Sequence, residues 1–508
     1  MGAFVSFLTK YSKTWAFLFG ALSVYAFAPH YVVALSFVSF SLLMFLLLYA
    51  KSGKQAFGIA YSFGFAHFAF GLIWIGNALL IEPDKFGWLY PFVFIGAGGF
   101  FGLFFAIPGW ISVKAASAWK KWIIFTASFV LFEWLRSFVL TGFPWNLIGY
   151  TLAFNDYLIQ SASIGGTYLL SLLALMGYCV GGIFLYKLSI KLFFKCAFVI
   201  LFVFAGLFII GYVRLLGIEV KNYDVLIRVV QPSIPQQIKW NEDIKENNFK
   251  EYLSLSATPS ERKPDFIIWG ETASPFILDR DFDHIQQVAD ILPQNSYLIT
   301  GMISYHPVNG RYRPHNSMVV INDKGLVEDY YHKSHLVPFG EYIPLRDYLP
   351  EFIKPVANAI GTFGKGRGPK VIKVDRKPSF GGIICYESIF PRSVVDQENR
   401  PDFLINLTND GWYGNSAGPY QHWVAAKFRA LEEGIALVRS ANNGVSGLIS
   451  PYGKDISMLG LNDRGFIDFI LPKPLKSATL YSVFGNGIIL AICFGLLVLG
   501  FVKKTKHA

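Results

Sequence analysis

Charged residues are scarce in this sequence. Asp, Glu, Lys and Arg make up only 16% of its 508 residues, whereas 53% are apolar and 17% are aromatic. A soluble protein carries nearer to about 25% charged residues, so the composition excludes an ordinary cytosolic enzyme of several domains. Cysteine is scarcer still: the four residues are too few for a disulfide framework, and no spacing among them matches a metal site. We therefore expect neither a bound metal nor another cofactor.

The apolar residues are concentrated in runs, most of which are long enough to cross a hydrocarbon core about 30 Å thick. The runs cover residues 14–28, 31–49, 56–80, 87–113, 122–140, 158–186, 193–213 and 481–502. The first is the shortest, and it could form a re-entrant hairpin with the second; two crossings would then be lost together, leaving the later topology unchanged. No cleavage site of the A-x-A type follows the first run, so we do not expect a cleaved signal peptide.

Acidic residues are missing from one set of loops between these runs, and lysines take their place. Thirteen lysines lie there: Lys10, Lys13, Lys51, Lys54, Lys114, Lys120, Lys121, Lys187, Lys191, Lys195, Lys503, Lys504 and Lys506. The positive-inside rule puts these loops and both termini in the cytosol. Seven spans within residues 1–216 then leave residues 222–472 outside, and an eighth span at 480–502 returns the chain to a cytosolic tail, 503–508.

The same lysines explain the net charge of +11, which alone could indicate a nucleic-acid-binding protein. Removing them from the 45 basic residues leaves 32, against 34 acidic residues, a net charge of −2. The basic charge therefore indicates membrane topology, and we expect no nucleic-acid partner.

Strand-like runs begin at Tyr223. Short apolar runs ending in turn residues alternate with helical stretches such as 243–256 and 420–433. This texture is typical of a layered α/β or α+β domain with one large core.

Three residues have complementary chemistry, and two of them lie at the ends of such runs. Cys385 is the only cysteine outside the apolar spans, Glu271 follows the run 265–269, and Lys333 leads into a loop rich in Pro and Gly. A thiol nucleophile needs a base and an anion stabiliser, roles that a carboxylate and a lysine can fill. Each residue alone is more often a buried thiol or a solvated charge, and no His/Asn pairing offers itself. The joint order Glu, Lys, Cys is what indicates a site.

This order resembles the nitrilase (carbon–nitrogen hydrolase) superfamily. Four segments are similar, more specifically, to the apolipoprotein N-acyltransferase family: Leu-Thr-Gly-Phe-Pro-Trp (140–145), Leu-Val-Pro-Phe-Gly-Glu (336–341), Ile-Cys-Tyr-Glu (384–387) and Asn-Asp-Gly-Trp-Tyr-Gly (409–414). By residue type alone, the first would be a belt of interfacial aromatic anchors; the resemblance makes it part of the family pattern.

The resemblance implies a bundle of eight transmembrane helices and a nitrilase-like αββα sandwich on the periplasmic side of a bacterial inner membrane. It implies ping-pong acyl transfer, with Glu271 as general base, Cys385 as nucleophile, and Lys333 plus a backbone N–H near Tyr386 stabilising the oxyanion. The donor would be the sn-1 chain of a phospholipid, phosphatidylethanolamine. The acceptor would be the α-amine of the diacylglyceryl-cysteine of apolipoproteins.

Further residues match family positions. Glu341 would orient Lys333 or act as the general base, and Tyr386 and Glu387 flank the nucleophile. Trp240 matches an aromatic near the lipid entrance, although an interfacial anchor explains it equally well. Residues 355–368, rich in Gly, are a hypothetical mobile lid. No self-complementary surface is evident, so we expect a monomer.

Two other functions remain open. A membrane-tethered amidase that passes the acyl group to water shares the first half-reaction, although the spans and lipid-side motifs favour transfer to an amine. A transporter or sensor would be indicated by inverted repeats or several charges within the spans. The only conspicuous pair is Glu133 and Arg136, three residues apart on one helix face and able to neutralise each other.

Overall fold

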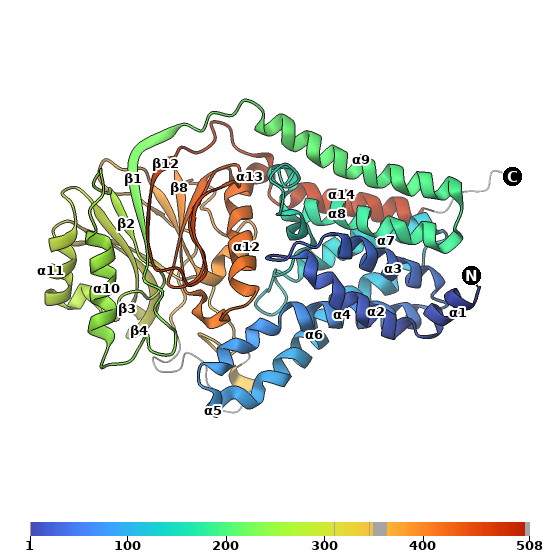
Figure 1. Cartoon of the computed structure of the whole chain (residues 1–508), viewed down its shortest axis with the longest axis horizontal. Helices are drawn as coiled ribbons and strands as arrows, with labels where there is room; N and C mark the ends of the chain where they lie inside the picture. The colour runs from blue at the N-terminus through green and yellow to red at the C-terminus, as the bar shows by residue number, and fades with distance from the viewer. Residues whose placement is uncertain (1, 309, 345, 349–362, 503–508) are drawn as a thin grey trace. The chain divides into compact units, whose positions relative to one another are not determined.

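The computed structural model describes residues 2–308, 310–344, 346–348 and 363–502. The chain divides into two compact units, each described below by itself (Figure 1). Unit 1 comprises Met1–Gly76, Phe86–Leu216 and Val483–Ala508, and unit 2 comprises Asn77–Lys85 and Gly217–Ser482. Most of the last apolar run, residues 483–502, therefore belongs to the same unit as most of the first seven runs.

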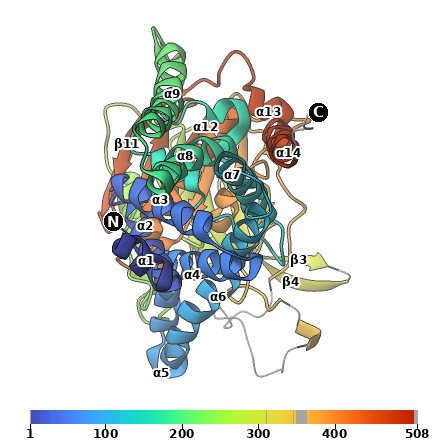
Figure 2. The same cartoon turned by 90° about the vertical axis from the view of Figure 1, so that its right-hand side faces the viewer.

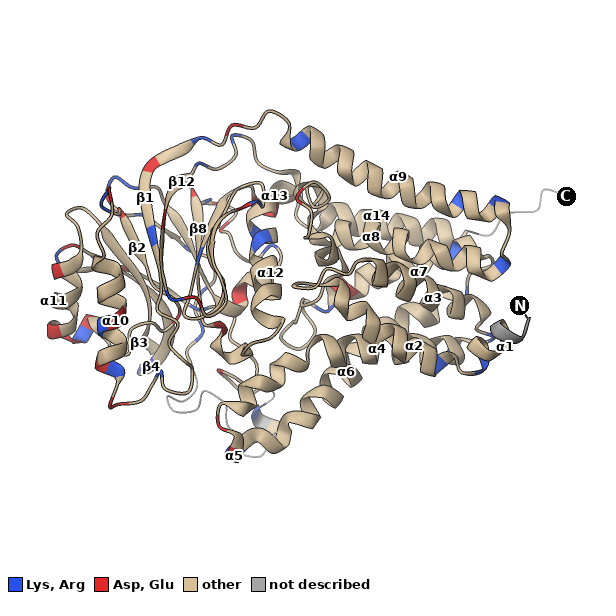
Figure 3. Cartoon of the chain, in the orientation of Figure 1, with Lys and Arg blue, Asp and Glu red and all other residues tan. Residues whose placement is uncertain are grey.

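Unit 1 is helical (Figure 2). Each predicted apolar run overlaps a helix, and the longer helices are α2 (Ser12–Ser23), α3 (Ala34–Tyr49), α4 (Gly53–Gly71), α6 (Tyr90–Ser112), α7 (Ala118–Leu135), α8 (Ala162–Lys187), α9 (Ile190–Leu215) and α14 (Gly487–Phe501). Helix α4 packs on α2 and α6, α8 packs on α3 and α9, and α14 packs on α7. Lys and Arg are visible near the start of α2 and of α9 (Figure 3), and Arg214 lies in the last turn of α9, at its other end.

Fewer helices than predicted have the length and hydropathy of a membrane span. Among the described residues, four qualify: Gly53–Leu80, Pro83–Ser112, Ala162–Lys187 and Ile190–Leu215; Ala34–Tyr49 and Gly487–Phe501 are shorter apolar helices. Helix α2 has only 12 residues, and α7 carries Lys120, Lys121 and Glu133 within 18 residues. The predicted count of eight spans is therefore not confirmed.

Glu133 and Arg136 bind a loop of unit 1. Arg136 Nη1 donates to the carbonyl oxygens of Phe143 and Trp145, both at 2.7 Å. Glu133 Oε1 accepts a hydrogen bond from the Ile148 N–H at 2.7 Å. Trp145 is buried although Leu140 is 68% exposed, so the end of the segment 140–145 that carries Trp145 lies in the interior of unit 1.

Unit 2 is built on two six-stranded sheets. The first has the order β12-β1-β2-β3-β4-β5, with β1 (Asn222–Gln231), β2 (Phe266–Ile268), β3 (Tyr297–Val308), β4 (Arg311–Asn322), β5 (Val327–His332) and β12 (Gly465–Pro472). The second has the order β11-β10-β9-β8-β7-β6, with β6 (Val371–Ile372), β7 (Phe380–Ile384), β8 (Phe403–Thr408), β9 (Ala436–Ala441), β10 (Ser446–Ile449) and β11 (Asp455–Leu459). Strands β1, β2 and β3 are parallel to one another, as are β7, β8 and β9, and the outer pairs are antiparallel.

The two sheets enclose an apolar core and carry helices on their outer faces (Figure 1). Phe266 of the first sheet contacts Phe380 and Phe403 of the second, with ring centroids 6.0 and 6.1 Å apart. Helices α10 (Lys245–Ala257) and α11 (Phe282–Ile291) cover the first sheet, and α12 (Gly418–Glu433) covers the second. The result is the layered α/β arrangement expected for residues 222–472.

Replacing Phe266 by alanine should lower the free energy of unfolding by about 3–5 kcal/mol, because the cavity lies between two sheets that cannot close around it. The matched control is Phe282→Ala, since Phe282 is 77% exposed and its loss should change stability by about 0.5 kcal/mol or less. Denaturant unfolding of the full-length protein in detergent measures both. Equal stability of the two variants would contradict the packing described for Phe266.

Candidate active site

The three residues singled out from the sequence follow strands of unit 2. Glu271 lies three residues after β2, Lys333 directly after β5, and Cys385 directly after β7. Thr408, at the end of β8, connects two of them: its carbonyl oxygen accepts a hydrogen bond from the Glu271 N–H at 3.2 Å, and its side chain hydrogen-bonds Cys385. The ends of strands from both sheets therefore meet at one place, as is common in α/β proteins.

Lys333 is shared between two carboxylates. Its Nζ lies 3.1 Å from Glu271 Oε1 and 2.9 Å from Glu341 Oε1. Asn316, on β4, donates from Nδ2 to the same two oxygens, at 2.7 and 3.0 Å. All four side chains are buried. The two donors and two acceptors close a ring that fixes both carboxylates with respect to the ammonium.

The charges of this ring hold Lys333 protonated. Burial alone would lower the pKa of the Lys333 ammonium, but the charges of Glu271 and Glu341 outweigh it and the pKa lies well above its usual range. A permanent cation is thus available beside the Cys385 thiol, where it would favour negative charge.

Cys385 is a buried thiol rather than a preformed thiolate. Burial raises the pKa of Cys385 to about 12; the Glu271 charge adds to this effect, and the charge of Lys333 opposes it. The thiol therefore needs a base to become a nucleophile near neutral pH. Cys385 also has a φ of +49°, a left-handed conformation that is uncommon for cysteine and costs free energy.

Glu387 holds the turn that carries Cys385. Its carboxylate accepts hydrogen bonds from the Tyr331 hydroxyl, from the N–H and hydroxyl of Ser334, and from the N–H groups of His335 and Ile384, at 2.7–3.1 Å. These donors belong to the segments that carry Lys333 and Cys385. Glu387 therefore connects the end of β5 to the end of β7.

A second polar network lies on the other side of Cys385. His422 Nε2 is 3.1 Å from the Cys385 carbonyl oxygen, and its Nδ1 is 2.8 Å from Asp410 Oδ1. Arg439 donates to Asp410 Oδ2 at 2.8 Å. All of these groups are buried, so the backbone of Cys385 is fixed by His422, which is held in turn by the Asp410–Arg439 ion pair.

Sequence reasoning assigned no role to Asn316, His422, Asp410 or Arg439. Asp410 lies in the segment 409–414, which is similar to the family pattern, and this similarity is the one feature of the sequence that could have indicated a role for it. The others lie on β4, α12 and β9, with no local motif to mark them.

The other residues predicted from the sequence, Glu341, Tyr386 and Trp240, differ in their burial and contacts. Glu341 is in the ring, and Tyr386 is buried beside the His335 ring, with centroids 5.6 Å apart. Trp240 is 41% exposed, next in the chain to the buried Lys239, whose Nζ is 5.7 Å from the Trp240 ring centroid. Exposure alone fits both an anchor and a lipid contact.

Most of the hypothetical lid, residues 355–362, lies outside the described residues. The described remainder is bonded to neighbouring backbone: the Gly364 N–H donates to the Pro314 carbonyl oxygen and the Gly366 N–H to the Lys333 carbonyl oxygen, both at 2.8 Å.

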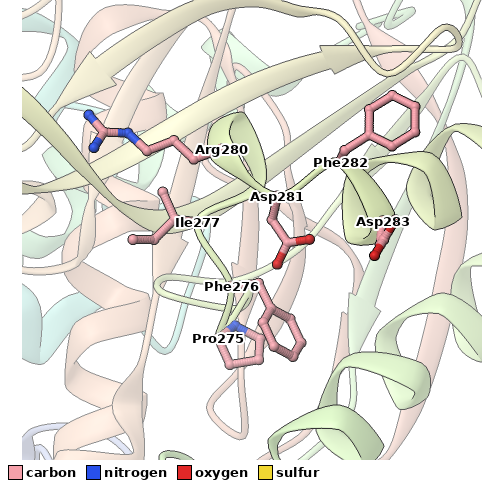
Figure 4. A pocket seen from close by; sticks show the side chains of 7 residues that line it. All are labelled: Pro275, Phe276, Ile277, Arg280, Asp281, Phe282 and Asp283. Carbon is pink, nitrogen blue, oxygen red and sulfur yellow. The ribbon is translucent and has the colours of Figure 1, made fainter.

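An open hollow of about 470 Å³ lies on the segment that follows Glu271. It is lined by Pro275, Phe276, Ile277, Arg280, Asp281, Phe282 and Asp283 (Figure 4). None of the predicted site residues lines it. In the described part of the chain, no group of three or more His, Cys, Asp and Glu side chains is arranged to hold a metal ion.

Comparison with known proteins assigns the family. An apolipoprotein N-acyltransferase N-terminal domain model matches residues 19–180, and a carbon–nitrogen hydrolase model matches residues 226–471. An apolipoprotein N-acyltransferase of Rickettsia typhi is 36% identical over 96% of this chain and 97% of its own. The chain belongs to the apolipoprotein N-acyltransferase family. Another member, from Rhodopseudomonas palustris, is 34% identical over 93% of this chain and 91% of its own.

Among solved structures, a mutant of the amidase from Nesterenkonia sp. AN1 in complex with butyramide is 14% identical and has a TM-score of 0.39, covering 54% of this chain and 98% of that one. The family assignment confirms the resemblance seen in the sequence. With the apolar helices of unit 1, the bacterial relatives indicate an inner-membrane protein.

Replacing Glu387 by glutamine should destabilise unit 2 by about 2–3 kcal/mol, because the new NH₂ group faces N–H and O–H donors that lose a charged acceptor. Glu398→Gln, at an exposed position, is the matched control and should leave stability unchanged. Thermal unfolding of the full-length protein compares them. A Glu387→Gln variant as stable as its control would show that the five donors do not depend on this carboxylate.

Proposed function

We propose that this protein transfers the sn-1 acyl chain of a membrane phospholipid, phosphatidylethanolamine, to the N-terminal amine of the diacylglyceryl-cysteine of apolipoproteins. Membership of the family supports N-acylation of lipoproteins in general. The observation that carries the mechanism is the Lys333 ammonium, held 3.1 and 2.9 Å from two carboxylates and electrostatically coupled to a buried thiol.

In the first half-reaction, Glu271 takes the proton of Cys385 as Sγ attacks the ester carbonyl carbon. The carbonyl oxygen becomes an oxyanion, stabilised by Lys333 and by a backbone N–H near Tyr386. The tetrahedral intermediate collapses as the bond to the glycerol oxygen breaks. Glu271 returns the proton to that oxygen, which releases a lysophospholipid and leaves a thioester on Cys385.

In the second half-reaction, the uncharged α-amine of the acceptor attacks the thioester carbonyl. The same oxyanion contacts apply, Glu271 accepts a proton from the amine nitrogen, and the C–S bond breaks. The products are the amide and the Cys385 thiolate, which regains its proton from Glu271. Burial of Cys385, Tyr386 and Lys333 supports an environment that keeps water from the thioester.

Two further residues complete the site. Glu341 orients Lys333, because one of its oxygens accepts from the ammonium while the other accepts from the Val337 N–H at 2.8 Å. This leaves Glu271 as the general base. Trp240 contributes an exposed ring on the lipid side of the site.

The proposal includes the topology derived from the loop charges. Seven spans within 1–216 precede a periplasmic catalytic domain at 222–472, and an eighth span at 480–502 leads to a cytosolic tail at 503–508. Both termini are then cytosolic, the protein acts as a monomer, and the active site faces acceptors in the periplasm.

The deciding experiment incubates the purified full-length protein with phosphatidylethanolamine and measures its intact mass, followed by peptide mapping. We expect one acyl adduct, on Cys385, that persists without an amine and clears when a diacylglyceryl peptide is added. Cys385→Ala should abolish the adduct, whereas Cys493→Ala, which removes a buried thiol of unit 1, should retain it. An unmodified Cys385 would overturn the proposal. Clearance by water alone at the same rate would instead indicate a tethered amidase.

Replacing Glu271 by glutamine should slow formation of the adduct by about 10²–10⁴-fold, because the proton of a thiol with a pKa of about 12 loses its acceptor. The exposed Glu261→Gln is the matched control. Single-turnover acylation followed by mass spectrometry gives both rates, and equal rates would exclude Glu271 as the base.

A further inference from the structure

Lys239 is a buried lysine that the mechanism above does not use. It lies in the segment after β1, between Ile238 and Trp240, which are 40% and 41% exposed, but is itself only 3% exposed. Burying an ammonium costs several kcal/mol unless hydrogen bonds and opposite charges compensate it. The groups around Lys239 must therefore compensate the cost of burying its ammonium.

The ammonium bonds the backbone of the catalytic loop. Nζ donates to the Glu271 carbonyl oxygen at 3.0 Å and to Thr272 Oγ1 at 3.1 Å. The Lys239 backbone is held in turn by Asn248, whose Nδ2 lies 3.3 Å from the Lys239 carbonyl oxygen. Among the described residues, both acceptors of this ammonium are neutral oxygens. Lys239 therefore forms no direct ion pair with any carboxylate that the structure describes.

The loop that Lys239 contacts is tightly constrained on its other sides. The Glu271 N–H donates to Thr408, and Thr272 has a φ of +46°. At Gly301, an added Cβ would lie 2.4 Å from the Thr272 nitrogen, so the backbone of β3 packs directly against this turn. Lys239 bonds the turn from the side of the segment after β1, and the position of the Glu271 carboxylate follows from all three contacts.

The charge of Lys239 acts on the same centre. Burial lowers the pKa of Lys239 to about 8, while the negative charges of Glu271 and of ionised Cys385 raise it. These couplings are reciprocal, so the ammonium favours negative charge on both groups. Beyond Glu271, the charged groups at this centre are Lys333, Glu341 and Asp410, the last paired with Arg439 at 2.8 Å. With Lys239 the three carboxylates are matched by three cations, whereas without it a net negative charge would oppose ionisation of the thiol.

We propose that Lys239 is a positioning residue, whose ammonium fixes the Glu271 turn and favours the Cys385 thiolate during acyl transfer. The inference rests on the proposed role of Cys385 as the nucleophile. The thiol proton still passes to Glu271, and no atom is transferred to Lys239. Because the pKa of Lys239 is about 8, its ammonium is charged below about pH 8 and contributes there. The contribution is lost above that pH, where the ammonium loses its proton.

The test measures the rate at which iodoacetamide, a small neutral reagent, alkylates Cys385 in the full-length protein; the thiolate sulfur forms a bond to carbon and iodide leaves. Peptide mapping separates Cys385 from Cys179, Cys196 and Cys493. The wild type is compared over a range of pH with Lys239→Met, which keeps the length of the stem, and Lys239→Arg, which keeps the charge. Lys250→Met, at a lysine whose side chain is 62% exposed, is the surface control.

Below about pH 8, Lys239→Met should alkylate about tenfold more slowly than the wild type, because one unit in the pKa of a thiol is a tenfold change in thiolate. The wild-type rate should flatten near pH 8 as Lys239 loses its proton, and this inflection should be absent from both Lys239 variants. Lys239→Arg and Lys250→Met should be close to wild type at neutral pH.

A purely structural role would give no inflection in the wild type, and that result would overturn the proposal even if Lys239→Met failed to fold. A folded Lys239→Met variant with the wild-type profile would overturn it as well. Alkylation requires neither phospholipid nor acceptor. Failure of the proposed acyl transfer would therefore appear as a missing acyl adduct, with the alkylation profile still measurable.

Discussion

The buried contact between Lys333 and two carboxylates is the interaction on which the site depends. Removing one member of a buried ion pair typically costs about 3–5 kcal/mol, because the remaining charges lose their compensation. Here the pair is extended by Asn316, which bonds both Glu271 and Glu341. The two carboxylates can lie close together only because a cation and a neutral donor stand between them.

The two-sheet architecture makes this contact possible. Glu271 and Lys333 come from one sheet and Cys385 from the other, so the three residues proposed as catalytic keep their spacing only if the sheets stay packed. The Phe266, Phe380 and Phe403 cluster supplies that packing, and Glu387 and Thr408 join the strand ends. The left-handed φ of Cys385 is maintained by these bonds, and residues held in such strained conformations recur at active sites.

The chemistry of the site could be predicted from residue type and position, but many of the hydrogen bonds that hold its residues in place could not. Glu271 and Cys385 follow apolar runs that could be recognised in the sequence, whereas Lys333 follows β5, a strand whose polar residues (Val-Glu-Asp-Tyr-Tyr-His) give no such signal. Asn316 and Lys239 carry no such signal, because an amide in a strand and a lysine beside a tryptophan acquire their roles only through contacts distant in sequence. The helices of unit 1 followed from the apolar runs. The predicted number of spans is not confirmed, because α2 has only 12 residues and α7 carries three charges, so neither is among the described helices with the length and composition of a span.

The proposed mechanism depends on a covalent intermediate on Cys385. The most direct test is whether this intermediate transfers its acyl chain fast enough to account for turnover. The acyl-enzyme is isolated after reaction with phosphatidylethanolamine carrying a labelled acyl chain, then mixed with a diacylglyceryl peptide in a quenched-flow experiment. We expect all of the label to pass to the amine of the peptide, at a rate no slower than steady-state turnover. Transfer slower than turnover, or label released as free fatty acid, would contradict the proposed mechanism.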